Sequence, residues 1–373
     1  MRVALVGLAF HLLVCASHLV VFRGDTSGFL HFGSTKNGLG TDDQKRELAH
    51  ARSILGSVQT PNEDGHDARY FWILARDPLL LHVEDLVAYT DRPLYRAQRI
   101  GYPLIVAPWR LFGERALVLG MLLTNLGAVF FGGYLCARLA QELGVAERAG
   151  LAFALNPGVL LGVVFDMSDA LALLFLVCAM LAIVRKRIGW AAFAGACAVL
   201  TKEPSFLAIL GISALSATWA LPRNPPQGAP RELTVRDRAL IVLAAAFAGG
   251  GWAVYVRMRL GWQSPHVVEF GPPFVGYFDA CREYWLPADA YVDALVSTLV
   301  VAAAVAIGVR WAKRRTLLLR AAVPYAVMIP FLSYAVMHLM TNSLRAIAPA
   351  LTFVVLDIYA TQARTARPAF STT

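Results

Sequence analysis

Residues 116–137 read ALVLGMLLTNLGAVFFGGYLCA, a stretch of 22 residues without a charged side chain. A helix needs roughly 20 apolar residues to cross the ~30 Å hydrocarbon core of a bilayer. The whole chain has the same character, because 57% of its 373 residues are hydrophobic and 16% are charged. A soluble domain has about 25% charged residues. The composition therefore argues against a soluble enzyme and predicts a membrane protein.

About ten apolar runs follow one another along the chain, and they predict an all-α polytopic membrane protein with about ten transmembrane helices. The predicted spans are residues 3–22, 116–137, 149–165, 167–184, 188–201, 205–221, 239–256, 291–309, 321–340 and 346–361. The first run carries a single basic residue, Arg2, and no clear small-x-small cleavage site before Arg23. We therefore expect a retained helix there rather than a cleaved signal sequence.

The basic residues of the short loops fall mostly on one side of the predicted membrane. With the N-terminus in the cytoplasm, 17 of them are cytoplasmic: Arg2, Arg138, Arg148, Arg185, Lys186, Arg187, Arg223, Arg231, Arg236, Arg238, Arg310, Lys313, Arg314, Arg315, Arg320, Arg364 and Arg367. Five are external: Lys202, Arg257, Arg259, Arg282 and Arg345. Because short cytoplasmic loops are enriched in Lys and Arg, we expect a multi-pass plasma-membrane protein with both termini cytoplasmic and an external active site. The bias also accounts for the net charge of +9, so no nucleic-acid partner is expected.

A Pro-rich stretch at residues 222–230 indicates a boundary between two helical parts. We predict an N-terminal transmembrane module over residues 1–222, which includes an external loop at 23–115. A cytoplasmic linker rich in Pro and Arg follows at 223–238, and a C-terminal transmembrane bundle occupies 239–373.

The external loop is far longer than the usual connection of about 4 to 6 residues. From Asp64 onward, aromatic and aliphatic residues such as those at 70–74 alternate with charges. This pattern predicts short amphipathic helices that lie at the membrane surface. The segment 100–112 is apolar but too short to span, so we interpret it as an interfacial or re-entrant helix.

Ionisable groups at the ends of spans are costly and usually mark a polar site or a water-filled cavity. Four separate segments are predicted to carry such groups to the same external face. The groups are Asp64 and Asp67 in the long loop, Asp166 and Asp169 after the third span, Lys202 and Glu203 after the fifth, and Arg345 before the tenth. A carboxylate there can take a proton from an acceptor hydroxyl, and a guanidinium or ammonium group can hold a phosphate.

Several short motifs in this region resemble those of a known family. They are DARYFWILA at 67–75, YRAQRIGYPL at 95–104, Asn-Pro at 156–157, SDAL at 168–171 and TKE at 201–203. Their order resembles the GT-C superfamily of polytopic membrane glycosyltransferases, and among them the bacterial relatives of the GPI-anchor mannosyltransferases. The family usually has Glu where this chain has Asp169, and Arg where it has Lys202.

The resemblance implies transfer of a hexose, mannose being one candidate, from a polyprenyl-phosphate sugar to a glycan, lipid or protein acceptor. Asp67 occupies the position of the family's catalytic base, with Asp64 as the reserve candidate. Arg96 and Arg99 precede the Tyr102-Pro103 segment, where a lipid phosphate is expected to arrive. Further candidates for substrate binding are Asp166, Asp169, Lys202, Glu203 and Arg345.

Each candidate also has a structural interpretation. Asp166 and Asp169 suit a turn and a helix N-cap, and interfacial arginine often binds lipid head groups. Lys202 and Glu203 can form an ion pair beside Pro204. Two other functions stay open for the whole chain: a transporter or flippase of lipid-linked intermediates, and a catalytically inactive GT-C-like membrane subunit.

No cofactor is predicted. The five cysteines form no CxxC pair, so neither a zinc site nor a disulfide framework is indicated. Asp64, His66 and Asp67 are too close together on a short helix for their side chains to converge on a metal ion. A divalent cation is therefore left open but has no assigned ligands.

Overall fold

The computed structural model describes residues 1–33, 42–61, 65–214, 233–262 and 269–365. Within these ranges the protein is all-helical, and its one extended pairing is an isolated bridge between Phe270 and Leu332. The candidate Asp64 and the greater part of the predicted linker, residues 223–232, lie outside the described residues.

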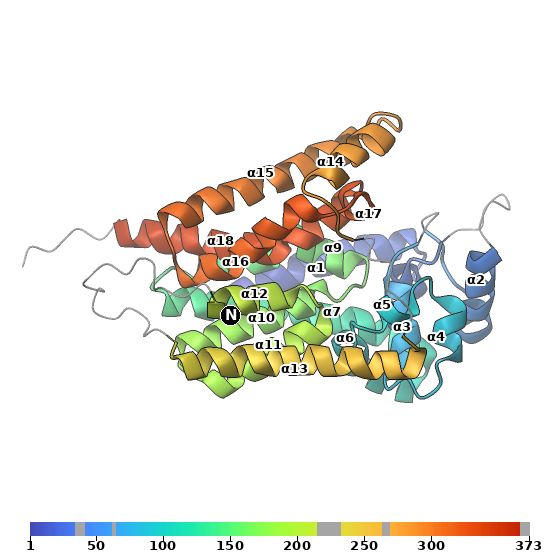
Figure 1. Cartoon of the computed structure of the whole chain (residues 1–373). Coiled ribbons are helices and arrows are strands. Elements are labelled where there is room, and N and C mark those ends of the chain that lie inside the picture. The colour runs from blue at the N-terminus through green and yellow to red at the C-terminus, as the bar shows by residue number, and fades with distance from the viewer. Residues whose placement is uncertain (34–41, 62–64, 215–232, 263–268, 366–373) are drawn as a thin grey trace, which may run out of the picture.

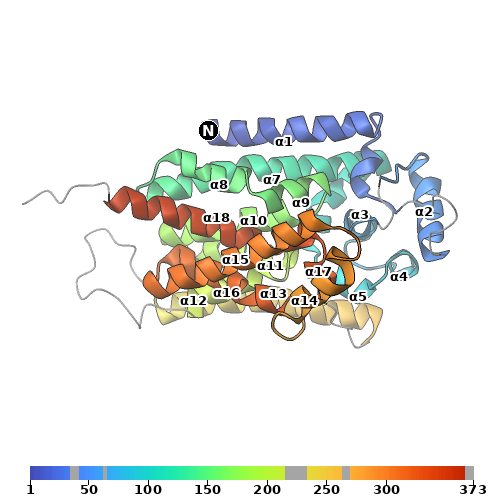
Figure 2. The same ribbon diagram turned by 90° about the horizontal axis from the view of Figure 1, so that it is seen from above.

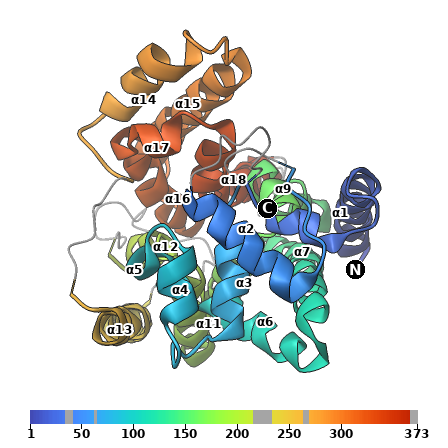
Figure 3. The ribbon, with the colours of Figure 1, turned by 90° about the vertical axis from the view of Figure 1, so that its right-hand side faces the viewer.

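Nine apolar helices of the described ranges run side by side and form a bundle (Figures 1 and 2). They are α1 (Arg2–Val21), α7 (Glu114–Glu142), α10 (Asp169–Val184), α11 (Ile188–Thr201), α12 (Ser205–Ala214), α13 (Val235–Leu260), α15 (Tyr291–Lys313), α16 (Leu317–Met328) and α18 (Met340–Thr365). α10 lies in the interior, and most of its side chains are buried. α13 and α15 lie on the outside (Figure 3) and keep few buried residues. Because both outer helices are apolar, their exposed faces suit contact with lipid.

By length and composition, five of the described helices can cross a membrane: α1, α7, α13, α15 and α18. The prediction of a membrane protein is therefore confirmed by helix length and composition, but the predicted number of ten spans is not confirmed. A sixth span is formed if the bent pair 147–154 and 157–164 counts as one. The remaining apolar helices, α10, α11, α12 and α16, are shorter than the test requires.

Prolines explain where two predicted spans are interrupted. The predicted span 149–165 contains α8 (Leu151–Ala154) and α9 (Pro157–Val164), which meet at an angle of 47°. Pro157 cannot donate the backbone hydrogen bond that would continue the first helix. The predicted span 321–340 is divided in the same way, because α16 gives way at Pro330 to a 3₁₀ turn and then to α17 (Tyr334–Met337).

The start of the C-terminal part also differs from the prediction. α13 begins at Val235, within the predicted linker. Thr234 accepts a hydrogen bond from the backbone N–H of Asp237, and the Asp237 side chain accepts one from the backbone N–H of Thr234. This reciprocal capping box fixes the helix start.

The long loop folds into short helices that cover one end of the bundle (Figures 1 and 3). They are α2 (Asp42–Leu55), α3 (Ala68–Arg76), α4 (Glu84–Tyr89), α5 (Pro93–Arg96) and α6 (Gly101–Val106), followed by a 3₁₀ helix, Ala107–Phe112. α3 does not lie at a surface, because Phe71, Trp72 and Leu74 are buried. By contrast, the 3₁₀ helix leaves Leu111 and Phe112 exposed, as an interfacial segment would.

Two glycines allow close approaches that bring the loop and α18 onto the bundle. A Cβ atom at Gly101 would lie 2.4 Å from Thr201 Oγ1 and 2.8 Å from the Thr201 backbone nitrogen. A Cβ atom at Gly158 would lie 2.7 Å from the backbone oxygen of Leu344, next to Arg345. Since such distances leave no room for a side chain, the two contacts depend on glycine.

Candidate functional site

A cavity of about 700 Å³ lies at the end of the bundle that the long loop covers. Its walls come from α10, α16 and α18, from the turn between α11 and α12, and from the segment around α5. Seven residues predicted from the sequence line it: Asp67, Arg96, Arg99, Asp169, Lys202, Glu203 and Arg345. The structure thus brings together side chains that are separated by up to 278 positions in the chain.

The first group is here called the Asp67 cluster. It consists of the cavity residues Asp67, Arg96, Arg99 and Glu203, together with Asp91, which pairs with Arg96 and does not line the cavity. Asp67 Oδ1 lies 2.6 Å from a terminal nitrogen of Arg96, and Oδ2 lies 3.5 Å from one of Arg99. Arg96 also holds Asp91 through two hydrogen bonds of 2.9 and 3.0 Å. Arg99 Nε contacts both carboxylate oxygens of Glu203, at 3.2 and 3.0 Å. Each guanidinium in this cluster is therefore shared between two carboxylates.

The two guanidinium groups determine the charge state of Asp67. Burial by itself would raise the pKa of this carboxyl, but the positive charges of Arg96 and Arg99 outweigh burial. The pKa of Asp67 is consequently held well below its usual range. Asp67 is ionised at neutral pH, and it is a weaker base than an ordinary aspartate.

The second group, here called the Asp169 cluster, consists of Asp169, Lys202 and Arg345. Asp169 is the first residue of α10, and its carboxylate is buried. Lys202 Nζ contacts Asp169 Oδ1, and Arg345 Nε donates to Oδ2 at 2.8 Å. One carboxylate thus holds two cations from different helices.

A proline adds a further partner to the Asp169 cluster. Pro349 lies inside α18 and has no backbone N–H, so the carbonyl of Arg345, four residues earlier, lacks its helical partner. Lys202 Nζ lies 3.5 Å from that carbonyl oxygen. The break in the hydrogen-bond ladder of α18 thereby helps to place the ammonium group.

The two ends of the cavity differ in charge balance. Around Asp67 the lining has three carboxylates, Asp67, Glu203 and Glu269, and three guanidinium groups, Arg92, Arg96 and Arg99, whereas the Asp169 cluster has one carboxylate and two cations. The two terminal nitrogens of Arg345 have no hydrogen-bond partner within the described ranges. An anionic ligand is therefore favoured at the Asp169 cluster rather than at Arg96 and Arg99.

The rest of the cavity wall is largely apolar. Leu173 and Leu176 of α10, Met328 of α16 and Val336 of α17 contribute to it. The site therefore combines a charged end with an apolar wall, which suits an amphiphilic ligand with a charged head and a hydrocarbon chain.

Asp166 is the predicted site residue that the structure places elsewhere. It is fully buried, and its Oδ1 accepts hydrogen bonds of 2.7 Å from both Tyr102 and Asn125. Its backbone is left-handed, with φ of 48°, in the turn before α10. Burial raises the pKa of Asp166 to about 7. The carboxyl ties α6 and α7 to this turn and does not line the cavity.

Other cavity residues were not singled out by the sequence. Arg92, Tyr95 and Glu269 are the main ones, and Arg92 forms an ion pair with Glu269. The Tyr95 ring lies 4.7 Å from the guanidinium carbons of both Arg92 and Arg99. The spacing of the arginines at 92, 96 and 99 is a helical signal that could have drawn attention to Arg92.

The segment between α13 and α15 carries several aromatic residues that could stack on a sugar. Four of them, Trp262, Tyr277, Tyr284 and Trp285, do not line the cavity. Trp285 is buried, and its indole N–H donates to the backbone oxygen of His338 at 2.9 Å. The segment reaches the cavity through Glu269 and Phe270 instead.

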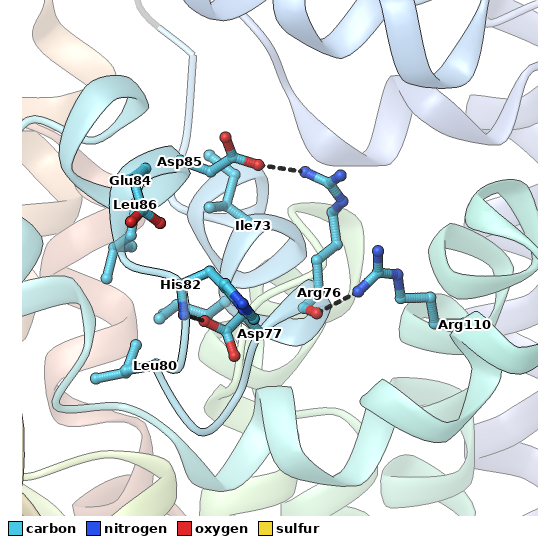
Figure 4. A pocket seen from close by; sticks show the side chains of 10 residues that line it. Ile73, Arg76, Asp77, Leu80, His82, Glu84, Asp85, Leu86 and Arg110 are labelled. Atoms are coloured by element: carbon cyan, nitrogen blue, oxygen red, sulfur yellow. Dashed lines mark hydrogen bonds and ion pairs between the residues drawn. The ribbon is translucent and has the colours of Figure 1, made fainter.

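A smaller hollow of about 280 Å³ lies within the long loop (Figure 4). Arg76 contacts Asp85 at 3.0 Å, and Arg110 donates to the backbone oxygen of Arg76. Asp77 accepts from the backbone N–H of His82 at 2.6 Å. These contacts join α3, α4 and the 3₁₀ helix. The polar groups around the hollow therefore have a structural role in the loop.

No group of three or more His, Cys, Asp or Glu side chains within the described ranges is arranged to hold a metal ion. Comparison of the chain with family models, curated proteins and solved structures gives no match. The function is therefore argued from the residues of the cavity.

Proposed function

We propose that the protein is a membrane glycosyltransferase that moves a hexose from a polyprenyl-phosphate sugar to an acceptor hydroxyl. The observation that carries this proposal is the separation of charge in one amphiphilic cavity. Surplus positive charge lies at Lys202 and Arg345, and the carboxylates Asp67, Glu203 and Glu269 line another part of the cavity. Positive charge stabilises a departing phosphate, and a carboxylate activates a hydroxyl by taking its proton.

The Asp169 cluster is the proposed site of the donor phosphate. Its two cations converge, and the terminal nitrogens of Arg345 are available for a phosphate oxygen. The apolar wall formed by residues such as Leu173 and Leu176 would take the first isoprene units of the lipid. Arg96 and Arg99, which the sequence suggested for this phosphate, are occupied by carboxylates and serve to organise the Asp67 cluster.

The reaction needs no group beyond those of the cavity and the two substrates. The acceptor oxygen attacks the anomeric carbon and loses its proton to a carboxylate. The bond between that carbon and the phosphate oxygen breaks, and the lipid phosphate leaves with the electron pair. Lys202 and Arg345 stabilise the negative charge that develops on it.

We further propose the finer topology that the sequence predicts. The short helices α10, α11, α12 and α16 would cross together with the longer ones, giving about ten crossings with the cavity on the external face. A thinner local bilayer accommodates short spans at modest cost. The position of the long-loop helices at one end of the bundle supports this arrangement, as does the resemblance to the GT-C superfamily.

Transfer of radiolabelled hexose from a polyprenyl-phosphate donor in membranes that contain the protein is the direct test. We expect the wild type to form a labelled product and Asp67→Asn to lose transfer by about 100-fold or more, because Arg96 and Arg99 lose their shared counter-ion. Unchanged transfer by this variant would remove Asp67 from the mechanism. No transfer by the wild type with any polyprenyl-phosphate hexose would favour an inactive membrane subunit.

A further inference from the structure

We propose that Glu269, and not Asp67, is the base that takes the proton from the acceptor hydroxyl. This inference rests on the proposed function and assigns one of its steps to a residue of the C-terminal half. Glu269 belongs to none of the sequence motifs discussed above, and it reaches the cavity from the segment after α13.

Four carboxylates line the cavity: Asp67, Asp169, Glu203 and Glu269. A general base needs an oxygen that can approach the hydroxyl. Both oxygens of Asp67 contact guanidinium groups, at 2.6 and 3.5 Å. Both oxygens of Asp169 are bound by cations, and both oxygens of Glu203 lie within 3.2 Å of Arg99 Nε.

Glu269 differs from the other three. Its Oε1 contacts a terminal nitrogen of Arg92, and its Oε2 accepts no hydrogen bond in the described part of the chain. Its side chain lines the cavity and is 20% exposed, close to the 24% of Asp67 and the 30% of Glu203, so Glu269 is distinguished by its free oxygen and not by its exposure. Among the four carboxylates, Glu269 is therefore the one with an oxygen left to accept a proton.

The backbone around Glu269 is held in place. Its carbonyl accepts a hydrogen bond of 3.0 Å from the backbone N–H of Ser333, and Gly271 donates one of 2.8 Å to Phe331. Phe270 forms the bridge with Leu332. A free oxygen on a fixed backbone is the arrangement that general-base catalysis requires.

The electrostatics of Asp67 support the same assignment. Two arginines keep its pKa well below the usual range, and proton transfer is most efficient when the pKa of the base lies near the working pH. Asp67 is then a positioning residue, which aligns Arg96 and Arg99. The proton moves from the acceptor hydroxyl to Glu269 Oε2 as the acceptor oxygen bonds to the anomeric carbon.

The test uses the purified full chain in liposomes, with decaprenyl-phosphate [14C]mannose as donor and octyl mannoside as acceptor. We expect Glu269→Gln to lower kcat by about 100-fold or more, with the KM for the donor changed by less than about threefold. Added formate should restore kcat to Glu269→Ala, because it replaces the missing carboxylate. Glu283→Gln is the matched control, because Glu283 lies in the same external segment and pairs with the exposed Arg282.

The outcomes separate this inference from the proposed function. Wild-type transfer together with a Glu269→Gln variant that keeps more than about a third of the wild-type kcat would overturn the inference alone. Formate rescue of Asp67→Ala but not of Glu269→Ala would also overturn it. Absence of transfer by the wild type would overturn the proposed function and the inference with it. Elution of each variant as a single species at the wild-type volume shows that a lost activity is not lost folding.

Discussion

At the scale of single residues, the buried carboxyls of this protein differ in what neutralises them. Asp169 is balanced by the cations Lys202 and Arg345, whereas Asp166 has only the neutral donors Tyr102 and Asn125. A buried carboxylate without a cation is costly, so the protonated form is favoured. We therefore assign Asp169 to the charged cluster of the cavity and give Asp166 a structural role.

The pH dependence of stability tests the role of Asp166. Its pKa rises from 3.8 to about 7 on burial, so the folded protein binds more protons than the unfolded chain between these values. The contribution of Asp166 to the free energy of unfolding is fully present below pH 3.8 and is lost as the pH rises through about 7. Between these two pH values, the free energy of unfolding decreases by up to about 1.4 kcal/mol per pH unit.

Thermal melting of the purified protein from pH 4.5 to 8 measures this effect. Asp166→Asn should remove the acid-side gain in stability, and Asn tolerates the left-handed backbone found at this position. The same pH dependence in the variant and the wild type would show that another group is responsible.

At the scale of elements, the site depends on the contact between α6 and the end of α11. Gly101 packs against Thr201, and this contact places Arg99 of the loop next to Glu203 of the following turn. A methyl group at position 101 cannot be accommodated without moving one helix, because backbone atoms of Thr201 lie in its way. The alignment of the two cavity segments that carry Arg99 and Glu203 therefore requires glycine at position 101.

Gly101→Ala is expected to destabilise the protein by about 1–3 kcal/mol and to reduce transfer activity. Gly127→Ala in α7 is the matched control, because a Cβ atom there meets no atom within 4 Å. Chemical denaturation and the transfer assay compare the two. Equal stability of the two variants would contradict the close contact at Gly101.

At the scale of the whole molecule, the structure places α2 to α5 at one end of the bundle and Met1 and the end of α18 towards the other (Figure 2). The proposed topology puts the first end outside the cell. In a Cys281→Ser background, a membrane-impermeant maleimide added to intact cells should label His82→Cys, which lies in the long loop, but not Lys186→Cys at the other end. Labelling of Lys186→Cys alone would place the cavity in the cytoplasm, where no polyprenyl-linked donor is proposed.

Much of this arrangement could be predicted from the sequence, because apolar runs and charged helix ends are local features. Asp67, Lys202 and Arg345 were chosen for their predicted side of the membrane, and Arg99 for its place before the Tyr102-Pro103 segment. All four line one cavity. Asp166 was grouped with them by position, but a backbone turn directs it towards Tyr102.

Other features depend on contacts that a sequence pattern does not contain. The partner of Glu269 is Arg92, 177 residues earlier, and no sequence pattern marks Glu269 as part of a site. The aromatic stretch that forms α3 was predicted to lie at a surface, but the surrounding loop helices bury it. The predicted ten spans exceed the five or six that pass the test of length and composition among the described helices, because short apolar helices and long ones look alike as hydropathy runs.

The central claim is that the Asp169 cluster binds the phosphate of a polyprenyl-phosphate lipid. Equilibrium binding of radiolabelled decaprenyl phosphate to the purified protein tests it most directly, with decaprenol as competitor. We predict saturable binding that decaprenol does not displace and that the double variant Lys202→Gln/Arg345→Gln weakens by about tenfold or more. Equal binding by the variant, or displacement by decaprenol as effective as by the unlabelled phosphate, would contradict the account.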